Sequence, residues 1–100
     1  MRVTYAERAR SDIVAIYEAI AAHDRAAAQR VEDLIRSRCQ GLAVFPFASV
    51  PTDEPGIRRL PLVRHPFTIY FRVDLTLELV EVARVIHAAR FRDLGRLPAE

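Results

Sequence analysis

The sequence contains no lysine, although 15 of its 100 residues are basic and every one of these is arginine. No side chain can therefore act as an amine nucleophile or as a lysine clamp for phosphate. Arginine stays charged at physiological pH and holds planar anions through two hydrogen bonds. The net charge of +2 permits an acidic partner or nucleic acid and requires neither.

Cysteine and glycine are also scarce. The single Cys39 excludes an internal disulfide and a zinc cluster made of thiolates from one chain. The three glycines form no phosphate-binding loop, there is no Gly-x-Ser-x-Gly motif, and His23, His65 and His87 lack metal-ligand spacing. We therefore expect no metal and no cofactor.

Long apolar runs are missing as well. None approaches the roughly 20 residues that a transmembrane helix needs, and Met1–Tyr5 leads into patterned sequence without the apolar stretch of a signal peptide. These features predict a cytoplasmic protein without membrane contact. The composition, 51% apolar and 28% charged, predicts one folded domain.

Hydrophobic spacing predicts the elements of the first half. Residues 1–5 alternate as in a short strand, and apolar residues then recur every three or four positions over 7–22 and 25–44. These two stretches predict helices, and the short connection with Asp24 as N-cap predicts an antiparallel hairpin. Three side chains of these stripes are expected in the core: Tyr17, Cys39 and Phe45.

The second half changes to a period of two. Prolines predict a loop over 45–56, and strands are predicted over 57–63, 67–73 and 77–87. Pro61 indicates an edge strand because it has no amide hydrogen. The last strand is expected to place Val80, Val82 and Ile86 on one face, and Arg84 and His87 on opposite faces unless a bulge intervenes.

The order of strand, two helices and three-strand meander predicts an α+β fold. The helical hairpin is expected to cover one face of a largely antiparallel sheet of about four strands. We expect a single domain over residues 1–92 and a loosely ordered tail over 93–100.

Basic residues gather beyond the loop, with histidines and Tyr70 among them. Two interpretations stay open: a face that binds RNA phosphates or acidic protein, or an ordinary solvated surface with local ion pairs. His87 is equally open, as a general acid or base or as the end of a strand. The arginines concerned are Arg58, Arg59, Arg64, Arg72, Arg84, Arg90, Arg92 and Arg96.

Several ordered segments resemble the RelE/ParE superfamily of toxins from type II toxin–antitoxin systems. They are Val3–Tyr5 with Asp12–Tyr17, Asp24–Ala28 with Val31, Pro51–Leu60, Tyr70–Val73, and Val82–His87 with Arg90. The resemblance spans residues 1 to about 92 and implies the same α+β fold. One departure is Ala6–Glu7, where the family often has a Ser-Pro pair at the start of its first helix.

The resemblance implies a toxin that a cognate antitoxin neutralises. ParE-like members act on DNA gyrase, and RelE-like members cleave messenger RNA on the ribosome. The missing lysines, and Ala88 where some ribonuclease members have tyrosine, favour the ParE-like branch. For that branch the resemblance implies a role in plasmid stabilisation. The alternative is a RelE-like endoribonuclease that uses His87 and Arg72.

The ParE-like interpretation implies contact residues and no catalytic ones. It also implies a ParD-like antitoxin, bound in a hetero-tetramer or larger assembly, and gyrase as the target, with no direct DNA binding by this chain alone. The residues expected to contact target or antitoxin are Arg58, Arg59, Arg72, Arg84, His87, Arg90 and Phe91.

Overall fold

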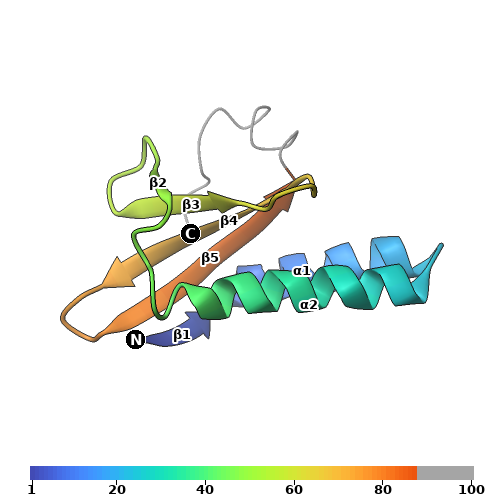
Figure 1. The fold of residues 1–100 in the computed structure, drawn as a ribbon, viewed down its shortest axis with the longest axis horizontal. Helices are drawn as coiled ribbons and strands as arrows, with labels where there is room; N and C mark the ends of the chain where they lie inside the picture. Colours follow the sequence, from blue (N-terminus) through green and yellow to red (C-terminus); the bar gives the residue numbers. More distant parts are fainter. Residues whose placement is uncertain (88–100) are drawn as a thin grey trace.

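The computed structural model describes residues 1–87, in which two helices pack on one face of a five-stranded sheet (Figure 1). The α+β prediction is confirmed. The strand order across the sheet is β1-β5-β4-β3-β2. In chain order the elements are β1 (Arg2–Tyr5), α1 (Glu7–Ala21), α2 (Arg25–Gly41), β2 (Val50–Pro51), β3 (Ile57–Pro61), β4 (Phe67–Asp74) and β5 (Leu79–His87). The predicted tail over 93–100, Arg90 and Phe91 lie outside the described residues.

The sheet is mixed, because β1 pairs with β5 in parallel while the other pairs are antiparallel. Val3 lies opposite Val80 and Tyr5 opposite Val82, and the backbone N–H of Ala6 donates to the Val82 carbonyl at 2.9 Å. This last bond extends the pairing of β1 with β5 to the residue before α1. The helical hairpin therefore leaves the sheet beside the middle of β5.

A fifth strand lies inside the predicted loop. Val50 and Pro51 pair with Arg59 and Arg58. Two residues are too few to show strand alternation, and proline is tolerated at the outer edge of a sheet. Pro61 pairs with Thr68 of β4 beyond the reach of β2, so within residues 1–87 it has a strand neighbour on one side only.

Some predicted boundaries and one core residue are wrong. Helix α2 ends at Gly41, three residues before the predicted end, and β5 begins at Leu79 rather than residue 77. Because α2 stops, Phe45 leaves its apolar stripe and is 69% exposed in the loop that follows. Tyr17 is half-buried, and Cys39 is buried as expected.

The main core lies between the helices and the sheet. Asp24 caps α2 by accepting a hydrogen bond from the backbone N–H of Ala27 at 3.0 Å, whereas Ala6 gives α1 no side-chain cap. The apolar stripes of both helices then face the strands. Buried members of this core include Ala9, Ile13, Val31, Ile35, Cys39, Ile69, Phe71, Val80, Val82 and Val85.

A β-bulge changes the alternation of β5. Phe71 faces Val82 and Tyr70 faces Arg84, so Ala83 is the extra residue. After the bulge, Val85 joins the core with Val80 and Val82. Ile86 instead belongs to a smaller buried cluster with Ile57 and Tyr70. The predicted grouping of Val80, Val82 and Ile86 on one face is therefore wrong.

The smaller cluster marks the face of the sheet opposite the helices, called here the second face. Among residues 1–87, its members come from β3, β4 and β5. Strand alternation places Arg59 and Arg72 on the same face, since they lie opposite Tyr70 and Ile57 in the register. The second face therefore combines an apolar centre with arginines beside it.

Candidate interaction surface

Arg84 is held by a carboxylate from helix α1. Its Nε and Nη2 donate to the two oxygens of Asp12 at 2.8 and 3.2 Å, and the backbone N–H of Val85 donates to Asp12 Oδ2 at 2.9 Å. The side chains of Arg84 and Asp12 are only 12% and 17% exposed. Arg84 therefore fastens α1 to β5, and it does not form part of an exposed basic face.

Arg58 is held by the loop between α2 and β2. Its Nε donates to Ser49 Oγ at 2.8 Å and its Nη2 donates to the Ser49 carbonyl at 3.0 Å. The guanidinium carbon also lies 5.0 Å from the centroid of the Phe47 ring, within range of a cation–π contact. These contacts give Arg58 a structural task in ordering the loop.

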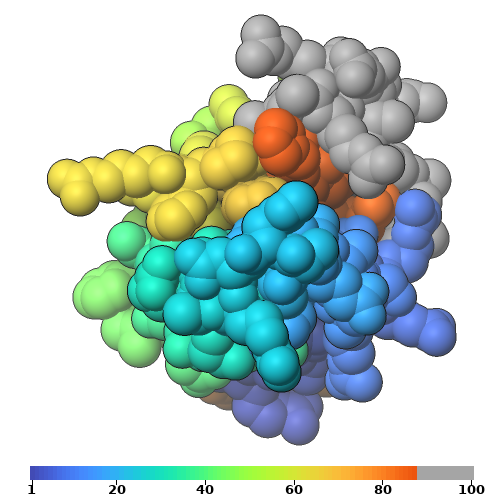
Figure 2. All heavy atoms as spheres, turned by 90° about the vertical axis from the view of Figure 1, so that its right-hand side faces the viewer, coloured from blue at the N-terminus to red at the C-terminus, as the bar shows by residue number. Residues whose placement is uncertain are grey.

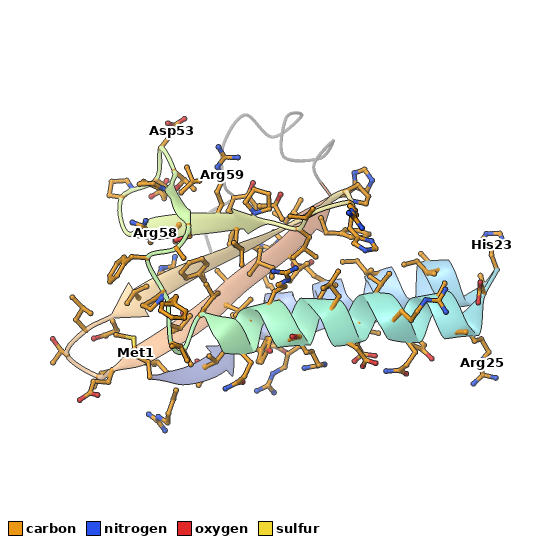
Figure 3. All side chains as sticks on the ribbon, in the orientation of Figure 1. Met1, His23, Arg25, Asp53, Arg58 and Arg59 are labelled. Carbon is orange, nitrogen blue, oxygen red and sulfur yellow. The ribbon has the colours of Figure 1, made fainter. Side chains whose placement is uncertain are left out.

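Neighbouring arginines of β3 lie on different sides of the sheet. Arg58 faces Phe71, a member of the main core, whereas Arg59 faces Tyr70 on the second face. Figure 3 shows Arg59 pointing away from the helices and Arg58 lying beside the loop. Period-two alternation accounts for the split. The predicted basic residues therefore do not gather on one surface.

Arg72 pairs with an acidic neighbour on the second face. Its Nη1 lies 3.7 Å from Glu81 Oε1, and the two side chains are 42% and 44% exposed. An ion pair this long and this exposed contributes little to stability. Arg72 therefore stays accessible to a partner.

His87 lies at the far end of β5 from Arg72. It faces Phe67, with the two rings edge to face and their centroids 5.6 Å apart. Arg72 is five positions further along β4, which at about 3.3 Å per residue separates the two sites by about 17 Å. Alternation also puts them on opposite faces. The structure does not bring together the two residues of the ribonuclease alternative.

Burial perturbs a cluster that joins β1 to α2. It raises the pKa of the Cys39 thiol from 9.0 to about 11 and that of the Tyr5 hydroxyl from 10.0 to about 12, with the thiol itself adding to the shift of Tyr5. The Arg36 guanidinium carbon lies 5.5 Å from the Tyr5 ring centroid. Cys39 is fully buried, so the cluster packs the core and offers no accessible thiolate.

A groove lies where the end of β5 meets α1. Its volume is about 410 Å³, and Asp12 and Arg84 stand at its edge. Figure 2 looks onto this end of the molecule, with β5 in orange-red beside the cyan and blue helical hairpin. The apolar lining comes from Ala15, Ile16, Ala19, Ile20, Phe67, Val85 and Ile86, with His87 beside them.

Two other kinds of site find no support in the described part of the chain. No three residues among His, Cys, Asp and Glu lie close enough within 1–87 to hold a metal ion. Over the same residues, neither helix has the length and apolar character needed to cross a bilayer.

The sequence matches the model of the ParE toxin of the type II toxin–antitoxin system parDE over residues 3–91. The chain belongs to the ParE toxin family. Among curated protein sequences none matches it. The ParE match agrees with the branch favoured by the absence of lysine.

Solved structures support the ParE assignment. A chain of the chromosomal ParDE system from P. aeruginosa is 26% identical with a TM-score of 0.76, over 87% of this chain and 95% of that one. A chain of the intact E. coli RelBE toxin–antitoxin complex is 15% identical, with a TM-score of 0.66 and coverage of 87% and 95%. Isolated E. coli RelE is 13% identical, with a TM-score of 0.65 and coverage of 94% and 95%. At such identities the RelE structures show the shared fold alone.

The sequence did not reveal the residues that contact the predicted site residues. Asp12 was noted only as part of the family pattern, although it is the partner of Arg84. Ser49, Phe47 and Phe67 carried no recognisable signal. The one available hint was an acidic residue near the inner stripe of α1, next to Ile13.

Proposed function

We propose that this ParE-family toxin inhibits DNA gyrase by protein–protein contact, without catalysis. The match to the ParE family over residues 3–91 carries the proposal. The separation of Arg72 from His87 by about 17 Å on opposite faces supports it, because a general acid and a phosphate-binding arginine must reach the same phosphate. The charge of Arg84 is already engaged by Asp12.

The proposed contacts with gyrase are arginines of the second face together with residues that follow β5 in the sequence. Arg59 and Arg72 flank the apolar centre of the second face, and Arg90 and Phe91 follow His87 in the sequence. Arg58 and Arg84 drop out as primary contacts because loop and helix groups hold them. Arginine is enriched at protein interfaces.

We further propose that a ParD-like antitoxin neutralises the protein in the cytoplasm, in a hetero-tetramer or larger assembly. The similar structures come from a ParDE system and from a RelBE complex, which are toxin–antitoxin pairs. The basic character of this chain, with an isoelectric point of about 9.2, suits an acidic partner.

Controlled expression without the antitoxin tests the target. Plasmid supercoiling and messenger RNA integrity are read from the same culture, and purified protein is then added to gyrase in vitro. We expect loss of supercoiling while messenger RNA stays intact. Codon-positioned cleavage with normal supercoiling would replace gyrase by the ribosome as target.

A separate measurement tests the antitoxin. The chain is co-expressed with the product of the neighbouring reading frame and passed through gel filtration at micromolar concentration. We expect one joint peak. Two separate peaks would refute the proposed antitoxin.

A further inference from the structure

The apolar centre of the second face is buried, although no helix among residues 1–87 lies over it. Ile57, Tyr70 and Ile86 are 2%, 0% and 3% exposed, and both helices pack on the opposite face of the sheet (Figure 1). An antiparallel sheet with one face open to water normally carries polar side chains on that face. The burial is present in a single chain, so the cover must come from the chain itself.

The arginines beside this centre do not account for its burial. Arg72 reaches toward Glu81 and is 42% exposed, and the Arg84 guanidinium is bound by a carboxylate of α1. Burial raises the pKa of the Tyr70 hydroxyl from 10.0 to about 12, although the charge of Arg59 opposes the shift. The hydroxyl is therefore shielded from water by more than a neighbouring charged side chain.

The sequence that continues beyond β5 has the reach and the pattern to supply the cover. β5 ends at His87, one residue after Ile86 of the buried cluster, and residues 88–100 follow. A segment of this length spans up to about 40 Å when extended, whereas β5 and β3 lie two strand spacings apart, about 10 Å. Its large apolar residues recur every third position with arginines between them: Phe91, Leu94 and Leu97, with Arg90, Arg92 and Arg96. Such a segment can turn its apolar side chains to the sheet and its charges to water.

We propose that residues 88–100 cross the second face of the sheet, with Phe91 and Leu94 over its apolar centre. The arginines of this segment then lie beside Arg59 and Arg72, and the two groups together form one basic surface. In this arrangement Phe91 anchors the segment, and the arginines contact an acidic surface of gyrase. The role in gyrase binding rests on the proposed function, whereas the cover over the second face rests on the burial.

A double-mutant cycle in the full-length chain tests the cover. Ile57→Ala and Phe91→Ala are made singly and together, and Ile69→Ala is the matched control, since Ile69 is equally buried but belongs to the main core on the other face. We expect the combined Ile57 and Phe91 variant to lower the thermal unfolding midpoint by at least about 3 °C less than the sum of the two single changes. The Ile69 and Phe91 pair should be additive to within about 2 °C.

Additivity of Ile57→Ala with Phe91→Ala would overturn the cover, because two residues in contact lose their shared interaction only once. Where an alanine variant fails to fold, Ile57→Val and Ile69→Val take its place in the same cycle. The same difference between the two pairs is then expected, and its absence would again overturn the cover.

Charge reversal tests the basic surface. Arg72→Glu and Arg92→Glu place negative charge on it, and Arg30→Glu makes the same change at an exposed position of α2. In a gyrase supercoiling assay, we expect the first two variants to raise the concentration for half inhibition at least about tenfold. The Arg30 variant should match the unmodified chain.

The outcomes separate the cover from the function. Unchanged inhibition by both variants of the basic surface would overturn that surface as the contact and leave gyrase as the target. If the unmodified chain did not inhibit gyrase, the proposed function and this contact would both fail. The double-mutant cycle would still decide the cover, because it needs no partner.

Discussion

At the scale of single residues, Asp12 has a role that its position on a helix surface does not suggest. Its carboxylate accepts three hydrogen bonds, two from the Arg84 guanidinium and one from the Val85 backbone. The bonds join residues 72 or 73 positions apart in the sequence and follow directly on the bulge at Ala83. The pairing of β1 with β5 ends at Tyr5, and the bonds to Asp12 take its place along the next part of β5.

Asp12→Ala should lower the free energy of unfolding by about 3 kcal/mol, because it removes three hydrogen bonds and the negative charge beside a mostly buried guanidinium. Glu81→Ala is the matched control. It breaks the exposed 3.7 Å pair with Arg72 and should cost less than about 1 kcal/mol. Urea denaturation of the two variants and the wild type measures the difference. Equal losses would contradict the role given to Asp12.

The raised pKa of the Cys39 thiol leads us to expect a loss of stability at alkaline pH. Its pKa is about 11 in the folded chain against 9.0 ordinarily, so the unfolded chain releases this proton first. Stability is therefore complete below about pH 9 and declines toward pH 11, by on the order of 2 kcal/mol. Tyr5, raised to about 12, adds to the decline above pH 10.

Urea unfolding at pH 8 and at pH 10.5 measures this decline, and Cys39→Ala serves as the comparison. The variant is less stable overall because it leaves a small cavity. Its stability should nevertheless fall less between the two pH values than that of the wild type. An identical fall would mean that Cys39 ionises alike in both states.

At the scale of elements, the two helices differ at their N-termini. Asp24 caps α2 with a hydrogen bond of 3.0 Å, while Ala6 holds the extended conformation of a cap at α1 without a side-chain acceptor. Asp24→Ala should lower the free energy of unfolding by about 1 kcal/mol, and Ala6→Ser should raise it by about 0.5–1 kcal/mol. Thermal or urea unfolding of the two variants checks both signs. A neutral Ala6→Ser would show that the α1 amides already find sufficient partners.

The elements were predictable where one local rule decides them. Helical spacing placed α1 and α2, Asp24 marked the start of α2, and alternation placed β4 to within a residue. The bulge at Ala83 was not predictable, because an alanine inside an apolar run leaves the pattern unbroken. Strand β2 is held by its pairing with β3, a contact that propensity does not encode.

The candidate site was less predictable than the fold because it depends on contacts between residues far apart in the sequence. The positions of the arginines in the sequence indicate where positive charge lies along the chain. The face of the sheet on which each arginine lies depends on the strand register, and its exposure depends on partners that are distant in the sequence. Arg84 and Arg58 are engaged by Asp12 and Ser49, and neither contact has a sequence signature. Arg59 and Arg72 share a face because of the pairing between β3 and β4.

At the scale of the whole molecule, the two residues of the ribonuclease alternative lie far apart on the sheet. His87 lies on the helix side at one end of the sheet, and Arg72 lies on the second face about 17 Å away. No single phosphate can contact both. Removing a general acid or base from an enzyme costs 10²–10⁴-fold in rate, whereas removing one contact from an interface typically costs tenfold or less.

The difference between losing a catalytic group and losing one interface contact can be tested by substitution. His87→Ala and Arg72→Ala should each leave messenger RNA on ribosomes as intact as the unmodified chain does, since the proposed function assigns catalysis to neither residue. In a gyrase supercoiling assay each variant should raise the concentration needed for half inhibition by no more than about tenfold, because the remaining contacts persist. Glu18→Ala, on the outer surface of α1, is the control and should match the unmodified chain in both assays. If the unmodified chain cleaved messenger RNA on ribosomes and either substitution abolished the cleavage, this protein would be an endoribonuclease. Arg72 or His87 would then have to act with a partner other than the one that the ribonuclease alternative assigns to it.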